Sequence, residues 1–291
     1  MNDLKNPPKE DASKQEFAKQ GPTLFEALLA KHPECSKNSL RIWLKHGRVI
    51  VAGRVVRNGE YIVKPGETFY LGQRVNKALG RLPVVYEDAH IVVVDKPQGL
   101  LSVATVFDTI NTAHAILKET YRPKRVYVVH RLDREVSGLL VFALTEEACQ
   151  GLKEMLKDHS CHREYYAIVE GRVKEPKGIW KSHLLEDANY VVASVEDPEA
   201  GQLAITHYTA LKTFDRHTHL SIELETGRKN QIRVHCKEAG HPIVGDVKYG
   251  ARGNLIKRLC LHACKLSFTH PVTGKPMVFT SPLPESFARI K

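Results

Sequence analysis

Short β-type runs alternate with helical segments along this chain, without a regular strand–helix–strand repeat. Runs rich in β-branched and aromatic residues indicate strands at 84–97, 124–130, 139–144, 163–171 and 220–225. Residues 109–120 and 146–159 instead have helical character. Thr145 offers the N-cap of the second of these helices, which carries two acids in its first turn. Because the helices are interspersed irregularly, the pattern predicts an α+β fold with a mixed, mostly antiparallel sheet and flanking helices.

The composition is that of a basic globular protein. The 291 residues carry a formal net charge of +10, and 42% of them are hydrophobic, which excludes a wholly disordered or fibrous chain. A pI near 9.2 favours polyanionic partners such as nucleic acid. No apolar run reaches the roughly 18 residues of a membrane span, and the first residues lack an apolar signal core. We therefore expect a cytoplasmic protein without a membrane partner.

Shifts in composition divide the chain into four parts. Residues 1–20 are polar and mixed in charge, and we expect a flexible leader. Two helical segments and several short β runs then form a small α/β unit over 21–72. A basic linker is expected at 73–82, and a long domain at 83–291.

The small unit carries a cationic helix. Ser36 offers an N-cap for a helix over 37–46, which Gly47 can terminate. Lys37, Arg41 and Lys45 then lie on one helical stripe, with Arg48 just beyond it. Such a stripe can follow RNA phosphates, although charge alone is equally consistent with an ordinary solvated helix face.

One aspartate lies between two β runs of the long domain. In VVHRLDREVSGLLVFAL (128–144) a β run ends at His130 and another opens after Gly138. Asp133 is therefore expected on a loop that is held at both ends and open to a cleft. Arg131 and Arg134 flank it, and nearby cations favour the ionised carboxylate that a nucleophile needs. A plain ion pair is the alternative interpretation.

A second polar segment follows the strand at 220–225. The strand stops at Thr226-Gly227, and Arg228 leads into a short helix over 230–239. From this strand-to-helix corner, the Arg228 guanidinium can reach a neighbouring loop.

No metal or cofactor site is expected. Scattered histidines and the Cys260, His262 and Cys264 cluster lack a second ligand pair at zinc spacing. The chain also has neither a GxGxxG fingerprint nor a Walker-type phosphate loop.

Four segments of the long domain resemble the ribosomal large-subunit pseudouridine synthase (Rlu) family. HRLDREVSGLLVFA resembles its catalytic motif, IVVVDKPQGLLSV its first motif, REYYAIVEG its tyrosine strand and TGRKNQIRVHCKEAGHPIVGDVKYG its third motif. Residues 39–67 in turn resemble the alpha-L RNA-binding motif shared with a small-subunit ribosomal protein. The two resemblances cover most of the chain.

The resemblance implies isomerisation of selected uridines in RNA to pseudouridine, with no cofactor. Asp133 would be the catalytic carboxylate, acting as a nucleophile or through a glycal route. Arg228 would pair with Asp133, and Tyr165 would stack on the target uracil. Ile232 would pack beside the base, while Arg131 would help to fill the gap that the extruded uridine leaves.

Three residues depart from the family pattern. Val136 stands where threonine is commoner, and Lys229-Asn230 stand where Thr-His is usual. Because the motif residues on both sides of Lys229-Asn230 are kept, we expect altered RNA contacts there rather than a loss of activity. Val136 lacks the threonine hydroxyl near the Asp133 loop, and the sequence leaves its effect open.

Several alternatives remain open from the sequence. A non-catalytic RNA-binding protein or a structural ribosome-associated protein would bind RNA without converting uridine. A glycoside-type hydrolase would need two carboxylates, and nothing singles out Glu135 as the partner of Asp133. Large-subunit ribosomal RNA is the favoured substrate, transfer RNA is possible, and a monomer is expected.

Overall fold

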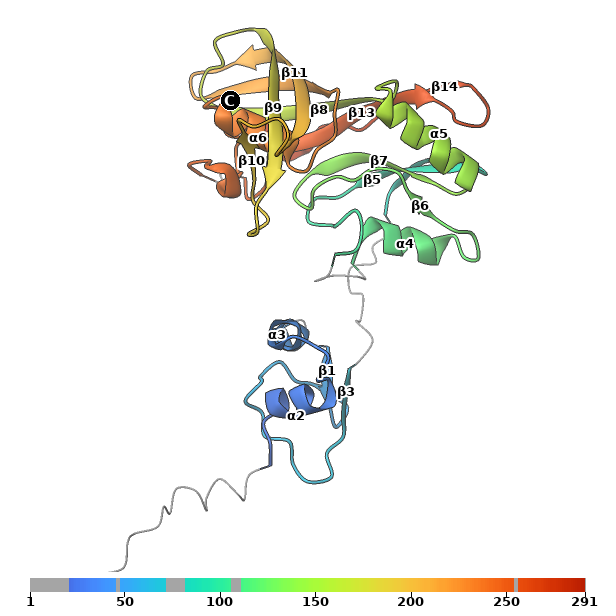
Figure 1. Cartoon of the computed structure of the whole chain (residues 1–291), viewed down its shortest axis with the longest axis vertical. Coiled ribbons are helices and arrows are strands. Elements are labelled where there is room, and N and C mark those ends of the chain that lie inside the picture. Colours follow the sequence, from blue (N-terminus) through green and yellow to red (C-terminus); the bar gives the residue numbers. More distant parts are fainter. Residues whose placement is uncertain (1–20, 46–47, 72–81, 106–110, 254–255, 291) are drawn as a thin grey trace, which may run out of the picture. The chain divides into compact units, whose positions relative to one another are not determined.

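The chain forms two compact units, residues 1–77 and 78–291, shown in Figure 1. The computed structural model describes residues 21–45, 48–71, 82–105, 111–253 and 256–290. We call the described parts of these units the small domain and the large domain. The predicted leader at 1–20, the predicted stop at Gly47 and most of the predicted linker at 73–82 lie outside the described residues.

The small domain packs two helices on a three-stranded sheet. Its elements are α2 (Leu24–Lys31), α3 (Lys37–Lys45), β1 (Val49–Val51), β2 (Arg54–Val55) and β3 (Phe69–Leu71). Thr23 begins α2 with a capping box, in which its side chain accepts from the Glu26 backbone. Ser36 likewise accepts from the Ser39 backbone at 3.1 Å at the start of α3. Both helices therefore begin where side-chain oxygens satisfy the first free N–H groups.

The two faces of α3 have opposite character. Leu40 and Leu44 are buried against α2 and β1 in one apolar cluster, whereas Lys37, Arg41 and Lys45 are exposed. The predicted cationic stripe therefore lies on the solvent face of a helix whose other face holds the small domain together.

The large domain is built on an 11-stranded sheet. Nine strands follow the order β10-β9-β11-β12-β8-β13-β7-β5-β4, while β14 pairs with β13 and β6 pairs with β7. The strands are β4 (Val84–Glu87), β5 (Ile91–Lys96), β6 (Tyr127–Val128), β7 (Ser137–Ala143), β8 (His162–Glu170), β9 (Lys177–Glu186), β10 (Val192–Val195), β11 (Gln202–Thr213), β12 (His217–Leu224), β13 (Leu261–Thr269) and β14 (Pro276–Thr280).

All pairings in this sheet are antiparallel except that of β13 with β7. The late strand β13 is thus inserted between β8 and β7 at the centre of the sheet. Gly138 makes the parallel contact possible, because a Cβ at this position would lie 2.2 Å from the Ala263 carbonyl oxygen. The predicted α+β fold with a mixed, mostly antiparallel sheet is confirmed.

Helices α4 (Ala113–Thr120) and α5 (Glu146–Lys157) cover opposite faces of β5 and β7 (Figure 1). Alternate strand residues supply the two cores: Val92 and Val94 pack with α4, whereas Ile91 and Val93 pack with α5. This part of the sheet is consequently buried on both faces, and β7 is buried along its whole length.

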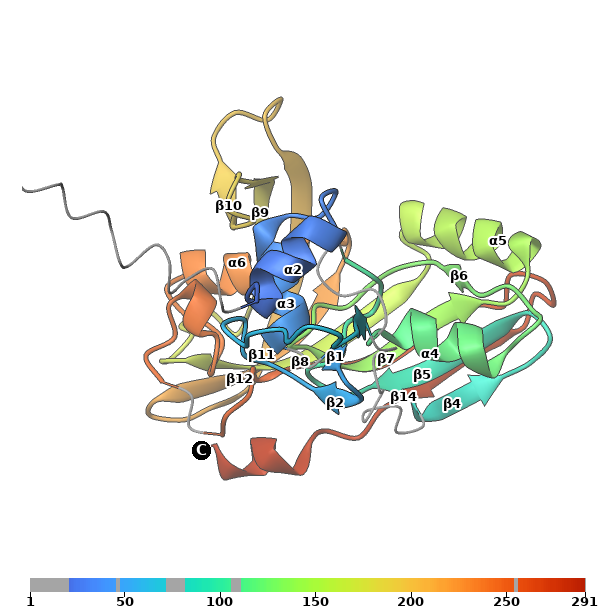
Figure 2. The same cartoon turned by 90° about the horizontal axis from the view of Figure 1, so that it is seen from below.

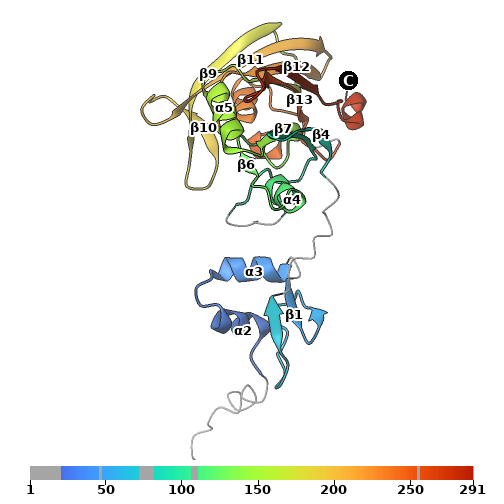
Figure 3. The ribbon, with the colours of Figure 1, turned by 90° about the vertical axis from the view of Figure 1, so that its right-hand side faces the viewer.

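The other half of the sheet carries helix α6 (Gln231–Glu238) and the short helix η1 (Val247–Tyr249), which pack on β9 to β11. Figure 3 shows β9 and β10 at one end of the domain, and Figure 2 shows the C-terminal η2 (Glu285–Arg289). No helix in the described ranges is long and apolar enough to cross a membrane.

Two elements differ from their predicted extents. The helix expected near 109–120 begins only at Ala113, after its N-cap Thr112. The strand expected over 124–130 is reduced to the two residues of β6, because the chain then leaves the sheet to enter the loop of Asp133. Helix α5 begins as its N-cap indicates, with Thr145 accepting from the Ala148 backbone.

Candidate active site

The polar segments singled out in the sequence meet at one cavity of about 580 Å³ in the large domain. Five predicted site residues line it: Arg131, Asp133, Tyr165, Arg228 and Ile232. They come from the loop before β7, from β8, and from the turn and helix after β12. The cavity therefore brings together side chains that are far apart in the sequence.

Hydrogen bonds from the segment 91–103 hold the loop that carries Asp133. The Ser102 hydroxyl donates to the Leu132 carbonyl oxygen at 2.7 Å and accepts from its N–H at 2.9 Å. The Gly99 N–H donates to the Arg134 carbonyl oxygen at 2.7 Å. The segment 91–103 thus holds the backbone on both sides of Asp133, and only 18% of the Asp133 side chain stays exposed.

The guanidinium that pairs with Asp133 belongs to Arg233. Its Nη1 lies 3.5 Å from Oδ2 of Asp133, while Nε and Nη2 each donate to Asp246 at 2.7 Å. Nη1 is also 3.4 Å from Oε2 of Glu135. This two-point contact with a buried carboxylate fixes Arg233 rigidly.

The predicted pairing of Arg228 with Asp133 is wrong. Arg228 lines the same cavity, but its side chain is exposed and its Nε donates to the Leu203 carbonyl oxygen at 3.0 Å. The physical reason is the turn before α6. Asn230 adopts a left-handed conformation (φ 53°), and the helix that follows directs Arg233 toward Asp133.

Asn230 is a second partner of Asp133 that sequence reasoning missed. The hydrogen-bond network orients its amide, because the reverse placement would set oxygen against the carboxylate. Its nitrogen then donates to Oδ2 and Oδ1 of Asp133 at 2.7 and 3.2 Å, and its oxygen accepts from the Tyr249 hydroxyl at 2.8 Å. Tyr249 is 1% exposed, so a buried hydroxyl fixes the orientation of the Asn230 amide.

The charge state of Asp133 is set by opposing influences. Burial raises the pKa of the carboxyl above its ordinary value, and Arg233 and Arg131 act in the opposite direction. Glu135 adds to the rise as a nearby like charge. Arg131 thus favours the ionised carboxylate in the direction that the sequence predicted, but burial is the larger effect.

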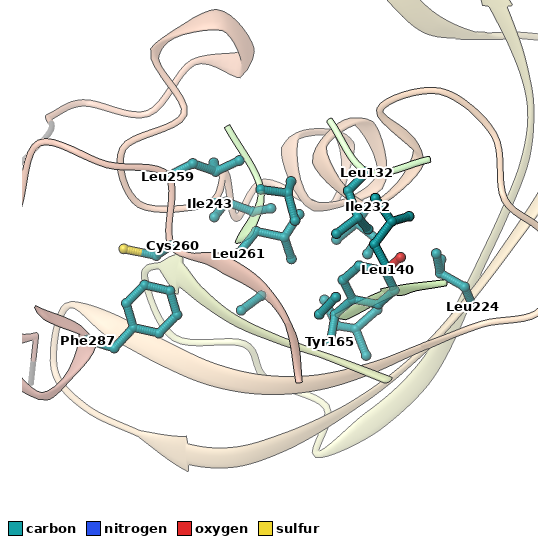
Figure 4. Packing of buried hydrophobic residues seen from close by; sticks show 14 of the residues in the cluster. Leu132, Leu140, Tyr165, Leu224, Ile232, Ile243, Leu259, Cys260, Leu261 and Phe287 are labelled. Atoms are coloured by element: carbon teal, nitrogen blue, oxygen red, sulfur yellow. The ribbon is translucent and has the colours of Figure 1, made fainter. Parts of the chain in front are cut away.

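Tyr165 and Ile232 form the apolar wall of the cavity. Each is 5% exposed, and they pack with Leu132 and Leu224 (Figure 4). Burial raises the pKa of Tyr165 to about 12, so its hydroxyl keeps its proton at neutral pH. A flat ring and a branched aliphatic side chain beside a carboxylate suit an extruded base.

The departures from the family pattern have distinct surroundings. Val136 is 2% exposed and packs in the core beneath the loop. Lys229 forms an ion pair with Glu186 of β9. Asn230 contacts Asp133, as described above.

The histidine of the Cys260, His262 and Cys264 cluster forms hydrogen bonds with two serines. His262 hydrogen-bonds Ser137 at 2.9 Å and Ser281 at 3.0 Å, both from buried positions. Among the residues described, no group of three or more side chains could hold a metal ion.

A second cavity of about 410 Å³ adjoins the first and shares Arg131, Asp133, Asn230 and Arg233 with it. Further cationic residues line it: Arg134, Lys229, Lys248, Lys257 and Arg258. Part of the chain's positive charge thus lies beside the carboxylate.

Comparison with known proteins agrees with this geometry. The sequence profile of the family described as RNA pseudouridylate synthase matches residues 90–238, which include the Asp133 loop, β8 and α6. The chain belongs to this family. It is an isomerase that converts uridine to pseudouridine in RNA. The alternatives of a non-catalytic RNA-binding protein, a structural ribosome-associated protein and a hydrolase are not favoured.

Several named relatives extend over nearly the whole chain. The ribosomal large subunit pseudouridine synthase D of Pseudomonas aeruginosa is 35% identical over 95% of this chain and 93% of its own length. That of Xanthomonas campestris is 34% identical over 91% of this chain and 87% of its own length. The RNA pseudouridine synthase YhcT of Bacillus subtilis is 32% identical over 86% of each chain.

Solved structures share the fold. Human RNA pseudouridylate synthase domain containing 4 superposes with a TM-score of 0.59 at 23% identity, covering 73% of this chain and 92% of its own. Human RNA pseudouridylate synthase domain containing 1 gives a TM-score of 0.58 at 24% identity, covering 71% and 85%. The mixed sheet of the large domain is therefore the pseudouridine synthase fold.

Proposed function

We propose that this pseudouridine synthase isomerises specific uridines of large-subunit ribosomal RNA, with Asp133 as the catalytic carboxylate. The observation that carries the role of Asp133 is its position in the cavity, buried against Arg233 and Asn230 and beside Tyr165. The observation that favours ribosomal RNA is the name of the relatives in Pseudomonas and Xanthomonas.

The reaction requires no outside reactant. The bond from uracil N1 to the ribose C1′ breaks, the base turns, and C5 bonds to C1′. The C5 proton is lost and N1 gains a proton, so the atoms balance. A carboxylate beside C1′ serves this rearrangement either by attacking C1′ or by accepting a ribose proton, and the geometry of Asp133 suits both.

The surrounding residues then divide the work of binding. The Tyr165 ring stacks on the uracil, and the Ile232 side chain packs beside the same base. Arg131 is exposed and lines both cavities. Its side chain fills the gap in the RNA base stack that the extruded uridine leaves. Arg228, at the exposed side of the cavity, contacts the RNA rather than Asp133.

The small domain provides the second hold on RNA. Lys37, Arg41 and Lys45 project from one face of α3, and Arg48 follows it. Arg41 and Arg48 lie over the rings of Phe25 and Trp43, at 5.4 and 5.3 Å from the centroids, which orders their guanidinium groups. We assign residues 21–72 to this RNA-binding domain and 83–291 to catalysis, in a cytoplasmic monomer.

A pseudouridine map of bulk RNA tests the proposal. It compares cells with the gene deleted, wild-type cells and cells carrying Asp133→Asn. Sites in large-subunit ribosomal RNA that vanish from both altered strains would support it. Sites lost on deletion but kept with Asp133→Asn would contradict the role of Asp133, and losses confined to transfer RNA would contradict the ribosomal target.

A further inference from the structure

Tyr190 is a large aromatic residue presented to solvent at the tip of the β9–β10 hairpin. Its side chain is 60% exposed, although aromatic rings of this size normally bury most of their surface. Figure 3 shows β9 and β10 at one end of the domain. Packing therefore does not explain the ring.

The backbone of Tyr190 is also unfavourable for a tyrosine. Its φ is 61°, in the left-handed region where glycine and asparagine are preferred and bulky residues are genuine outliers. The Asn189 and Val191 N–H groups donate to Oδ1 of Asp187 at 2.9 and 2.8 Å. The hairpin tip is thus held in a conformation that costs energy with this residue, and such strain is typical of functional positions.

Two lysines that line the second cavity contact Tyr190. The Lys229 ammonium lies 5.4 Å from the ring centroid, and the Lys248 ammonium donates to the Tyr190 carbonyl oxygen at 3.0 Å. Lys229 is positioned in turn by its ion pair with Glu186. Because both lysines line the cavity that Asp133 also lines, the Tyr190 ring lies next to side chains of that cavity.

We propose that Tyr190 is a stacking platform for an unpaired nucleobase next to the target uridine, with Lys229 and Lys248 contacting the adjoining phosphates. An exposed ring with cations around it is the arrangement by which single-stranded nucleic acid is bound without sequence readout. The proposal rests on the proposed function only in that the ligand is the RNA that this chain modifies.

The chain offers a matched set of variants. Tyr190→Phe keeps the ring and the backbone strain, whereas Tyr190→Gly removes both. Ile179→Ala is the control, because Ile179 is 61% exposed on the same strand β9 and does not line either cavity. The probe is a stem-loop RNA around a uridine that the map assigns to this chain, whichever RNA contains it.

Binding is measured by fluorescence anisotropy in the Asp133→Asn background, so that no turnover occurs. We expect Tyr190→Gly to weaken RNA binding about tenfold, as loss of one base–aromatic stack does, while Tm stays equal or rises. Tyr190→Phe and Ile179→Ala should bind within about twofold of the parent. Unchanged binding by Tyr190→Gly, or an equal loss in Tyr190→Phe, would overturn the stacking role.

Single abasic nucleotides at each unpaired position then locate the stacked base. One position should weaken binding to the tyrosine protein about tenfold and leave binding to Tyr190→Gly unchanged, because the stack is already absent. If every abasic position costs both proteins the same, the platform does not exist. If the target uridine lies in transfer RNA, the proposed ribosomal substrate is wrong, but the stacking role of Tyr190 can still be tested on that RNA.

Discussion

The amide nitrogen of Asn230 lies 2.7 Å from Oδ2 of Asp133 and 3.2 Å from Oδ1, so one neutral side chain donates to both oxygens of the carboxylate. Arg233 reaches the same carboxylate from 3.5 Å. The nearer donor is therefore uncharged, and the position of Asp133 depends on a residue that departs from the family pattern.

Removal of the Asn230 amide should impair catalysis without unfolding the domain. Asn230→Gly is the suitable change, because glycine tolerates the left-handed backbone and a helix N-cap. Loss of hydrogen bonds to a charged group costs about 1.5–3 kcal/mol, so we expect kcat to fall about 10- to 100-fold. Single-turnover pseudouridine formation measures it.

Tyr249→Phe is the companion variant, since it frees the Asn230 amide while leaving it in place. A smaller loss of kcat in the same direction is expected. If Asn230→Asp, which sets a second carboxylate against Asp133, retained full activity, the positioning role of Asn230 would be wrong.

Arg233→Lys and Arg228→Lys form a matched pair. Lysine cannot reproduce the two-point contact of Arg233 with Asp246, and breaking a buried ion pair costs about 3–5 kcal/mol. We expect Arg233→Lys to lower both Tm and activity strongly. Arg228→Lys, at an exposed position, should lower activity less than about tenfold and leave Tm unchanged. The reverse order would restore Arg228 as the partner of Asp133.

The pH dependence should report the raised pKa of Asp133. Catalysis requires the ionised carboxylate, so the rate should fall with decreasing pH at values above the ordinary 3.8 of an aspartate. A pH–rate profile of kcat measures this limb. A limb at or below the ordinary value would contradict burial as the dominant influence.

The same shift affects stability with a definite sign. A carboxyl whose pKa is raised on folding stabilises the native state below its unfolded pKa, and that stabilisation is lost as pH rises through the folded pKa. Asp133→Asn cannot ionise. Its Tm should therefore exceed that of the wild type at about pH 8 and approach it near pH 3, below the unfolded pKa of about 3.9, as measured by calorimetry.

Neutralising Lys37, Arg41 and Lys45 to glutamine should weaken RNA binding and flatten its salt dependence. Each lost phosphate contact lowers the slope of log K against log salt by up to about 0.9. The control is Lys31→Gln on α2, outside the α3 stripe. An unchanged slope in the triple variant would exclude α3 as the main hold on RNA.

Local sequence signals predicted much of the fold and part of the site. The polar loop between two β runs located Asp133, and Thr145 and Ser36 marked the starts of α5 and α3. The family motifs placed Tyr165 and Ile232 where they line the cavity with Asp133. These features depend on residues that are close in the sequence, so the sequence alone is sufficient to predict them.

Features that depend on distant contacts were missed. Arg228 and Arg233 both lie in the third motif, and only the left-handed turn at Asn230 decides which one faces Asp133. The anchor of Arg233 is Asp246, 13 residues further along, and helical spacing does not reveal it. The insertion of β13 between β8 and β7 is likewise a tertiary choice, because pairing partners are not encoded in strand periodicity.

The central place of β13 has a consequence for biosynthesis. Its His262–Ala263 segment pairs with Ser137–Gly138, which directly follows the loop of Asp133. That loop is therefore synthesised more than a hundred residues before the strand that fixes it. Long-range pairings of this kind form late in folding, so a nascent chain gains its active site only after β13 has emerged from the ribosome.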